Sequence, residues 1–324
     1  MLQALRLRGL VADVTKYAFL ASPPLPPLPP PPTHTQKTNK HPSAALLEAR
    51  LAAKPLALYC GFDPTAPSLH VGNLLAMVTL LRFQEQGHRP IALIGGATGL
   101  IGDPSGRSTE RPQQDEQVVV HNAVKIQQQL ESIFGRRLPV GAHVPPVAFV
   151  NNADFYKSTN ILDFVGRVGR HIRVSSMLGK DSVKTRLASE AGISYAEFSY
   201  QLFQAYDFYA LHRQEQCILQ IGGSDQWGNI TAGIDLIHKL TASNENNKAP
   251  DAFGLTLPLI TDATGQKFGK SAGNAVWLSP ELTRPFAFYQ VRTISSISKK
   301  KEKVTYRRWF SFLSAPMTSR WAAC

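Results

Sequence analysis

Residues 55–96 read PLALYCGFDPTAPSLHVGNLLAMVTLLRFQEQGHRPIALIGG, and this stretch decides the fold. Leu56–Cys60 and Pro90–Ile94 are short apolar runs of strand length. Between them, Asn73–Gln86 has apolar residues at helical spacing and ends at Gly87, which is typical of a helix C-cap. A strand, a helix and a strand within about 40 residues predict a parallel βαβ unit, the start of a Rossmann-like sheet.

The rest of the sequence keeps alternating between helix and strand. The further helices that we predict are Ala44–Ala53, Gln117–Phe134, Ile161–His171, Ser194–Tyr209 and Asn229–Leu240. The further strands are Val147–Val150, Cys217–Ile221 and Leu255–Ile260. We therefore predict an α/β fold in which order begins near Ser43 and ligands bind at the carboxyl ends of the strands.

Composition narrows the class of protein. The chain has 324 residues, of which 43% are hydrophobic, as in globular proteins. No apolar run is long enough to cross a bilayer, so we expect no membrane partner. Cys60, Cys217 and Cys324 are too few and too scattered for a disulfide framework or a metal site. We therefore expect no protein-bound metal and a reducing compartment.

The net charge of +12 lies mostly at the two ends of the sequence. Residues 1–40 carry five Lys/Arg against one acid, residues 291–324 carry eight against one, and the body between them is almost neutral. Basic residues among apolar ones make residues 1–40 resemble an organelle-targeting leader, with an undirected disordered tail as the alternative. Pro23–Pro32 contains eight prolines and indicates an extended spacer.

The first candidate site lies where a predicted strand meets a predicted helix. Tyr59–Thr65 runs into His70–Asn73, which reads His-Val-Gly-Asn. Free backbone N–H groups and the helix dipole favour phosphate at such a helix start. Thr65 and His70 can donate to phosphate oxygens, and Gly72 lets an adenine approach the backbone. Taken alone, such a motif is more often a helix cap, and its place directly after Tyr59–Thr65 is what favours a phosphate site.

The second candidate site is the segment Lys267-Phe268-Gly269-Lys270-Ser271. Two lysines three residues apart, with a hydroxyl beside them, can grip pyrophosphate oxygens, and the glycine lets a loop close. In isolation the segment could be a solvated basic turn. The two motifs in this order predict a site that holds ATP while its α-phosphate is attacked.

These motifs resemble those of tyrosyl-tRNA synthetases of the bacterial and organellar type. The likeness extends to GGATGLIGDPSG at residues 95–106, YQLFQAYD at 200–207 and GGSDQWGN at 222–229, and it runs colinearly over about residues 43–290. It implies a class I synthetase catalytic domain over residues 41–290, with a Rossmann-like parallel sheet and a helical insertion. Asn73 stands where the signature usually has a second histidine, a familiar variant among tyrosyl enzymes.

The resemblance implies three groups of site residues. The residues that it makes catalytic are Thr65, His70, Arg107, Arg111, Lys267, Lys270 and Ser271. The residues that it makes tyrosine-binding are Tyr59, Asp103, Tyr200, Gln204, Asp207 and Gln226. The residues that it makes ATP-binding are Gly61, Asp63, His70, Gly72, Asn73, Gly222, Asp225 and Lys270. Because Tyr200, Gln204 and Asp207 are spaced at i, i+4 and i+7, one helix face presents all three; a solvent-facing polar stripe is the alternative.

The reaction implied by the resemblance is ATP-dependent activation of L-tyrosine to tyrosyl-adenylate, followed by transfer to tRNA(Tyr). Mg²⁺ is expected to enter with ATP. The tyrosine carboxylate is already a nucleophile, so the first step needs positioning and charge stabilisation rather than a general base. The resemblance also implies a homodimer, and Ile161–Leu178 has more apolar residues than one buried face needs. The expected location is the mitochondrial matrix, with the cytoplasm as the alternative.

Two other functions compete with this interpretation. A nucleotidylyltransferase shares the phosphate loop but does not need the Tyr200, Gln204 and Asp207 face. A non-charging or RNA-binding product of a synthetase gene is the alternative of a different class.

The C-terminal end is the reason for the second alternative. By resemblance, Ser279–Gln290 should lead into a helical anticodon-binding domain, but residues 291–324 are a basic tail that contains the charge run Lys299–Lys303. The tail is either a diverged start of that domain or a translation of intronic or frame-shifted sequence, which would make the protein a synthetase truncated at its C-terminal end. We expect such a protein to activate tyrosine but to charge tRNA poorly.

Overall fold

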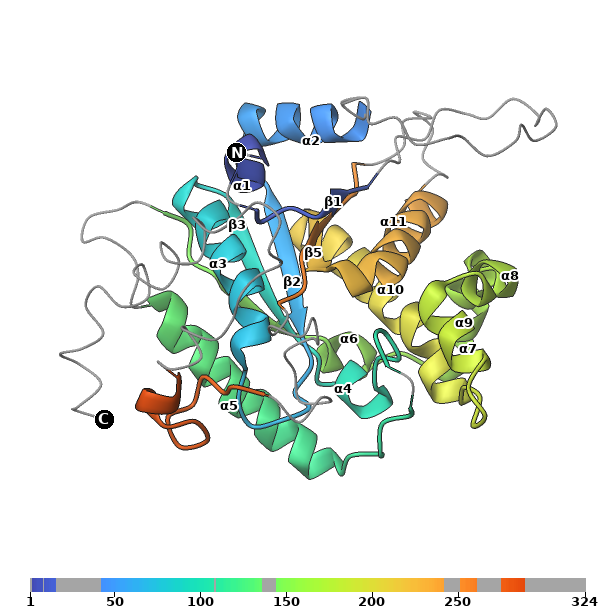
Figure 1. Ribbon diagram of the computed structural model, residues 1–324. Coiled ribbons are helices and arrows are strands. Elements are labelled where there is room, and N and C mark those ends of the chain that lie inside the picture. The colour runs from blue at the N-terminus through green and yellow to red at the C-terminus, as the bar shows by residue number, and fades with distance from the viewer. Residues whose placement is uncertain are drawn as a thin grey trace, which may run out of the picture.

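The computed structural model of the protein describes residues 2–7, 9–15, 42–107, 109–135, 144–241, 251–260 and 275–288 (Figure 1). Within these residues the strands form one six-stranded sheet in the order β1-β6-β5-β2-β3-β4. All neighbours are parallel except β1, which is antiparallel to β6. The strands are β1 Asp13–Val14, β2 Ala57–Phe62, β3 Arg89–Ile94, β4 Ala148–Asn151, β5 Cys217–Gly223 and β6 Phe253–Leu257.

Helices cover both faces of this sheet, as Figure 1 shows. The α-helices are α1 Leu2–Leu7, α2 Pro42–Ala53, α3 Val71–Glu85, α4 Thr98–Ile101, α5 Glu116–Gly135, α6 Ala153–Tyr156, α7 Ile161–Arg167, α8 Val174–Leu178, α9 Asp181–Leu187, α10 Tyr195–Glu215 and α11 Trp227–Thr241. Short 3₁₀ turns cover Gly169–His171 and Ser224–Gln226. The predicted α/β fold with a Rossmann-like sheet is confirmed.

Alternation along β2 sorts its side chains between the two faces of the sheet. Leu58, Cys60 and Phe62 belong to the core cluster that includes residues of α1, α2, α3 and α5. Tyr59 belongs to the cluster on the other face, together with residues of α10 and α11. Since successive strand residues point to opposite faces, this register directs Tyr59 toward α10.

The N-terminal segment corrects the expectation that order begins near Ser43. Leu2, Leu5, Leu10 and Val14 are buried in the core. The Ala12 N–H donates to the Thr256 carbonyl over 2.7 Å, so β1 covers the edge that β6 would otherwise expose. A composition rich in leucine and arginine fits a leader and a docked helix equally well, which is why composition did not predict the packing. Residues 16–41, including the proline run, lie outside the described residues.

Several predicted element boundaries also differ from the structure, among them the end of the helix predicted over Ser194–Tyr209, which continues to Glu215. The helix expected over Ile161–His171 ends at Arg167 and continues as a 3₁₀ turn. Glycines at 166 and 169 beside β-branched valines weaken helical propensity there. The last strand begins at Phe253 and ends at Leu257, because Pro258 has no N–H to donate to the ladder.

None of the described helices combines the length and the apolar character that crossing a membrane requires.

Candidate active site

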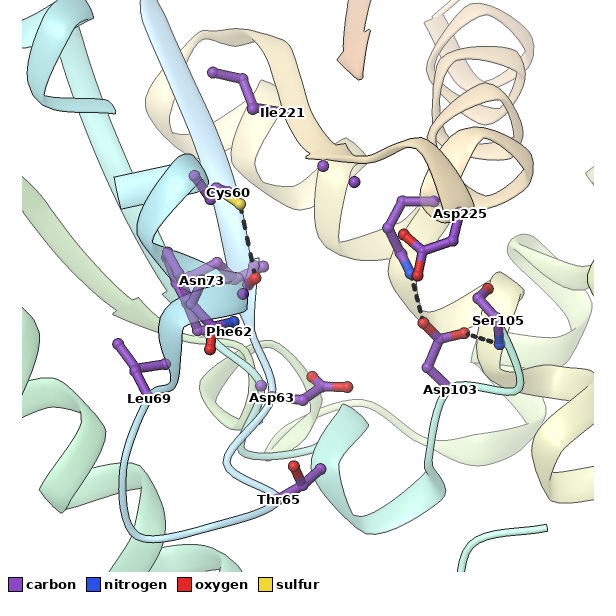
Figure 2. Close-up of a pocket in the computed structure, with 18 of the residues that line it drawn as sticks. Cys60, Phe62, Asp63, Thr65, Leu69, Asn73, Asp103, Ser105, Ile221 and Asp225 are labelled. Carbon is purple, nitrogen blue, oxygen red and sulfur yellow. Dashed lines mark hydrogen bonds between the residues drawn. The ribbon is translucent and has the colours of Figure 1, made fainter. Parts of the chain in front are cut away.

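A pocket of about 290 Å³ opens at the carboxyl ends of β2, β5 and β6, beside the first turn of α3 (Figure 2). Most of the residues singled out in the sequence line it. They are Tyr59, Gly61, Asp63, Thr65, His70, Gly72, Asn73, Asp103, Arg111, Tyr200, Gln204, Asp207, Gly222, Asp225 and Gln226. Arg107 is not among the lining residues. Lys267, Lys270 and Ser271 lie outside the described residues, so their roles stay predictions.

Asp207 is a buried polar group that lines the pocket. Its side chain is buried, and both carboxylate oxygens accept hydrogen bonds. Asn152 Nδ2 donates to Oδ2 over 2.8 Å, and the Tyr156 hydroxyl donates to Oδ1 over 2.8 Å. Burial raises the pKa of Asp207 to about 7, while the bonds from Asn152 and Tyr156 hold the pKa down and the nearby Asp63 raises it.

Tyr59 lies on the same side of the pocket and is 1% exposed. Its ring packs against Phe208, with 5.3 Å between ring centroids. Its hydroxyl has no hydrogen-bond partner within the described part of the protein, although it is buried. Burial and the charge of Asp207 raise the pKa of Tyr59 well above its usual value, so the hydroxyl stays protonated and can donate. A buried donor without a partner is costly, which makes it a candidate contact for a polar ligand atom.

A series of side-chain hydrogen bonds links Asp207 to the middle of the pocket. Asn152 Nδ2 also donates to Thr98 Oγ1 over 2.9 Å, and the Thr98 hydroxyl donates to Asp63 Oδ1 over 2.8 Å. The Tyr200 hydroxyl donates to Asp63 Oδ2 over 2.8 Å. Burial raises the pKa of Asp63, and these two donors counteract the rise. Because each donor has an acceptor along the series, two carboxylates are held in fixed orientations.

Gly95 allows this series to form. A side chain at Gly95 would overlap Asp63 Oδ1 and Thr98 Oγ1, so the backbone must pass here without a Cβ atom. Packing therefore explains why the first residue of the Gly95-Gly96 motif after β3 is glycine.

A second hydrogen-bonded group surrounds Asp103 (Figure 2). Gln226 Nε2 donates to Asp103 Oδ2 over 2.7 Å, and the Ser105 N–H donates to Oδ1 over 2.9 Å. Asn229 Nδ2 donates to Gln204 Oε1 over 2.9 Å. Asn229 Nδ2 also donates to Gln226 Oε1 over 3.3 Å, so Asp103, Gln204 and Gln226 lie together at one wall of the pocket. That they bind tyrosine stays a prediction.

The first turn of α3 forms the opposite wall and differs from the sequence-based expectation of free N–H groups. The Val71 N–H donates to the Val276 carbonyl, the Gly72 N–H to His70 Nδ1, and the Asn73 N–H to the His70 carbonyl. The N–H groups of the first three helical residues are therefore already used. The sequence did not predict that residue 276 would reach this turn, because the contact spans about 200 residues.

His70 caps α3 in a reciprocal arrangement. Its Nδ1 accepts from the Gly72 N–H over 3.0 Å, and Asn73 Oδ1 accepts from the His70 N–H over 3.0 Å. An accepting Nδ1 fixes the neutral tautomer with the proton on Nε2, which is then a donor. The capping interpretation of the motif and its phosphate-binding interpretation are therefore compatible.

Sequence reasoning missed four residues of these networks: Thr98, Asn152, Tyr156 and Asn229. Asn152 follows directly after β4, so the rule that ligands bind at carboxyl ends of strands could have found it. Thr98 and Asn229 lie inside motifs already noted. Tyr156 had no signal, because only the tertiary fold brings α6 to α10.

Known proteins resemble this one in both sequence and fold. The family described as "tRNA synthetases class I (W and Y)" matches residues 51–317. A tyrosine–tRNA ligase of Acidothermus cellulolyticus is 53% identical over 247 residues, which cover 75% of this protein and 55% of that one. The mitochondrial tyrosine–tRNA ligase of Drosophila melanogaster is 52% identical over 245 residues, which cover 72% of this protein and 51% of that one.

A solved structure gives the same result. The C-terminally truncated mitochondrial tyrosyl-tRNA synthetase of Coccidioides posadasii superposes with a TM-score of 0.70 at 31% identity, over 90% of this protein and 73% of that one. The sequence spans just over half the length of the two curated relatives above. With a family match across most of its length, relatives above 50% identity and a shared fold, this protein belongs to the tyrosyl-tRNA synthetase family of class I synthetases.

Proposed function

We propose that the protein activates L-tyrosine with ATP to give tyrosyl-adenylate and pyrophosphate, and transfers the tyrosyl group to tRNA(Tyr). One observation carries the proposal: the pocket has a buried polar end, Asp207 with Tyr59, opposite a capped helix start. The Asp207 end suits a polar group beyond an aromatic ring, and the other end suits negative charge because Thr65, His70 and Arg111 line the pocket there. Tyrosine in line with ATP meets both requirements.

The polar end accounts for selection of tyrosine over phenylalanine. We assign the Asp207 carboxylate as acceptor of the phenol O–H and the Tyr59 hydroxyl as donor to the phenol oxygen. Phenylalanine would leave both buried groups unpaired, and sites of this kind discriminate by up to about 10⁵-fold without editing.

The middle of the pocket suits the amino and carboxylate groups of tyrosine. Asp103, Tyr200 and Gln204 offer acceptors to the ammonium, and the Gln226 amide stands beside them. Asp225 and Gly222 are assigned to the ribose side, where Gly222 leaves the strand end without a side chain. Asp63 and Gly61 are assigned to the adenylate.

The phosphate end supplies charge stabilisation. In the proposed step a tyrosine carboxylate oxygen attacks the α-phosphorus of ATP, and the bond from that phosphorus to the bridging oxygen of pyrophosphate breaks. Thr65, His70 through Nε2, and Arg111 are assigned to the phosphates, together with Arg107 and the Lys267–Ser271 segment. Their work is stabilisation of developing charge, so no proton needs to be removed. Mg²⁺ enters with ATP as part of the substrate.

A homodimer and a mitochondrial location belong to the same proposal. Ile161, Leu162 and Val165 of α7 are 65%, 77% and 50% exposed, an apolar surface that a second copy of the protein would cover. Sedimentation of the wild type against Leu162→Asp tests the dimer; a wild type that stays monomeric at micromolar concentration contradicts it. The Drosophila and Coccidioides relatives, both named as mitochondrial, support the location, which imaging of the tagged protein would test.

The proposed reaction has a direct test with two halves. Tyrosine-dependent exchange of labelled pyrophosphate into ATP measures activation, and attachment of labelled tyrosine to tRNA(Tyr) measures transfer. The same preparation is assayed for both, with phenylalanine in place of tyrosine as the control. Exchange that does not depend on tyrosine, or that phenylalanine supports equally, would refute the proposed substrate.

A further inference from the structure

Tyr156 is the member of the Asp207 network that α6 supplies. It is the last residue of α6, and its hydroxyl reaches across to Asp207 on α10, 51 residues later in the sequence. The hydroxyl lies 2.8 Å from Asp207 Oδ1 and 3.1 Å from the Phe203 carbonyl oxygen. It has a single hydrogen, and a charged acceptor at the shorter distance is the stronger partner.

The ring of Tyr156 is held by aromatic packing. Ring centroids of Phe164, Phe203 and Tyr206 lie 6.0, 5.5 and 5.6 Å from its own. The position of the hydroxyl is therefore set by contacts that do not involve the oxygen. Removing only that oxygen would leave the packing intact.

We propose that Tyr156 is a positioning residue of the tyrosine pocket, whose hydroxyl keeps the Asp207 carboxylate ionised and turned toward the phenol of bound tyrosine. This inference rests on the proposed function, because it assigns Asp207 to the phenol. Asn152 donates to one carboxylate oxygen of Asp207, and Tyr156 donates to the other. Each oxygen can accept more than one hydrogen bond, so an acceptor position remains open for the ligand.

The surroundings of Asp207 explain why its charge needs support. Asp207 is 2% exposed, and the titratable groups that face it are Asp63, Tyr59, Tyr156 and Tyr200. Asp63 is the charged group among them, and its charge opposes ionisation of Asp207. Support for the carboxylate comes from two neutral donors, Asn152 and Tyr156. Losing the Tyr156 donor would move the pKa of Asp207 upward from about 7.

The test compares Tyr156→Phe with Tyr206→Phe in the full-length protein. Tyr206 belongs to the same aromatic cluster, so its variant also loses one hydroxyl there but leaves the bond to Asp207 in place. The first readout is the titration of the Asp207 carboxyl in the ligand-free protein, followed by NMR with ¹³C-labelled aspartate and assigned with Asp207→Asn. The second is the dissociation constant for L-tyrosine between pH 6.5 and 8.5, with thermal unfolding of each variant as a check on folding.

In Tyr156→Phe the Asp207 titration should move up by about one pH unit, because a hydrogen bond to a charged group is lost. Tyrosine affinity should then fall about eightfold at pH 6.5. At pH 8.5 it should fall less than about twofold, because the Asp207 carboxyl is mostly ionised in both proteins there. Tyr206→Phe should leave both readouts unchanged.

Three other outcomes are distinguishable. An unmoved titration in a folded Tyr156→Phe overturns the inference. A loss of affinity that is equal at every pH assigns Tyr156 a merely structural role and also overturns it. A moved titration in a protein whose wild type does not bind tyrosine refutes the proposed function instead, and leaves the effect of Tyr156 on Asp207 established.

Discussion

The two ends of the pocket are built in different ways. At the inner end, Asp207, Asn152 and Thr98 are nearly fully buried, and side chains bond to one another in a continuous series. At the outer end, the N–H groups of the first turn of α3 are paired with His70 and with the Val276 carbonyl, and partly exposed side chains such as His70, Thr65 and Arg111 line the pocket. The inner end can select a substrate, because a wrong ligand would leave its buried polar groups without hydrogen-bond partners. The outer end can stabilise the charge that develops during the reaction.

Removing the carboxylate at the inner end should have the largest effect. In Asp207→Ala the phenol O–H of bound tyrosine would lose its charged acceptor in a buried place, which should cost about 3 kcal/mol of binding free energy, or over about 100-fold in tyrosine affinity. Calorimetric titration with tyrosine measures this loss. Asp154→Ala is the matched control, since Asp154 forms an exposed ion pair with Lys157 and should change affinity less than about twofold. If Asp207→Ala binds tyrosine as tightly as wild type, the inner end does not select the substrate and the contrast between the two ends is wrong.

Substitutions of His70 should separate capping from chemistry at the outer end. Both His70→Ala and His70→Asn should slow tyrosyl-adenylate formation by about 100-fold with tyrosine affinity unchanged, because a donor to the transition state is lost. Only His70→Ala should also lower the free energy of unfolding, by about 1 kcal/mol, since asparagine keeps a cap acceptor. Single-turnover kinetics and denaturant unfolding measure the two effects. If His70→Asn reacts at the wild-type rate, His70 is a cap and nothing more.

The inner end should also make the stability of the protein depend on pH. Because burial raises the pKa of Asp207 to about 7 from the ordinary 3.8, the folded state resists its ionisation. The contribution of Asp207 to stability is therefore highest below pH 3.8 and falls as pH rises toward 7. The stability of Asp207→Asn relative to wild type should rise by about 2–3 kcal/mol between pH 5 and 8. Urea unfolding of both proteins across this range checks it, and parallel pH profiles would mean that Asp207 titrates normally.

The smallest expected effect lowers tyrosine affinity without lowering the stability of the ligand-free protein. Tyr59→Phe should weaken tyrosine binding by about 0.5–1.5 kcal/mol, or roughly 2- to 12-fold. The same variant should be at least as stable as wild type without ligand, because the lost hydroxyl is buried and has no partner within the described residues. Tyrosine titration measures the change in affinity, and thermal unfolding of the ligand-free protein measures the change in stability. A variant that is clearly less stable would show that the hydroxyl already has a structural role.

The sequence was most informative where function depends on local spacing. The face of α10 that carries Tyr200, Gln204 and Asp207 follows from helical periodicity alone, and all three residues line the pocket. The strand and helix order followed from apolar runs, with boundaries shifted by a few residues. What escaped prediction depends on contacts between distant segments. The hydrogen bond from Tyr200 to Asp63 spans 137 residues. No local pattern indicates that the Val276 carbonyl will accept from the Val71 N–H of α3.

The pairing of β1 with β6 has a consequence for how the protein is made. Thr15 Oγ1 accepts from the Gly254 N–H, and these two residues are 239 positions apart. At synthesis rates of about 5–20 residues per second, roughly 10–50 seconds separate the appearance of the first strand from that of its partner. During that interval Leu2, Leu5 and Leu10 cannot complete their packing in the core cluster that they share with residues of β6. The N-terminal segment is synthesised well before β6 but is among the last to be secured, because closing so long a loop is a late event in folding.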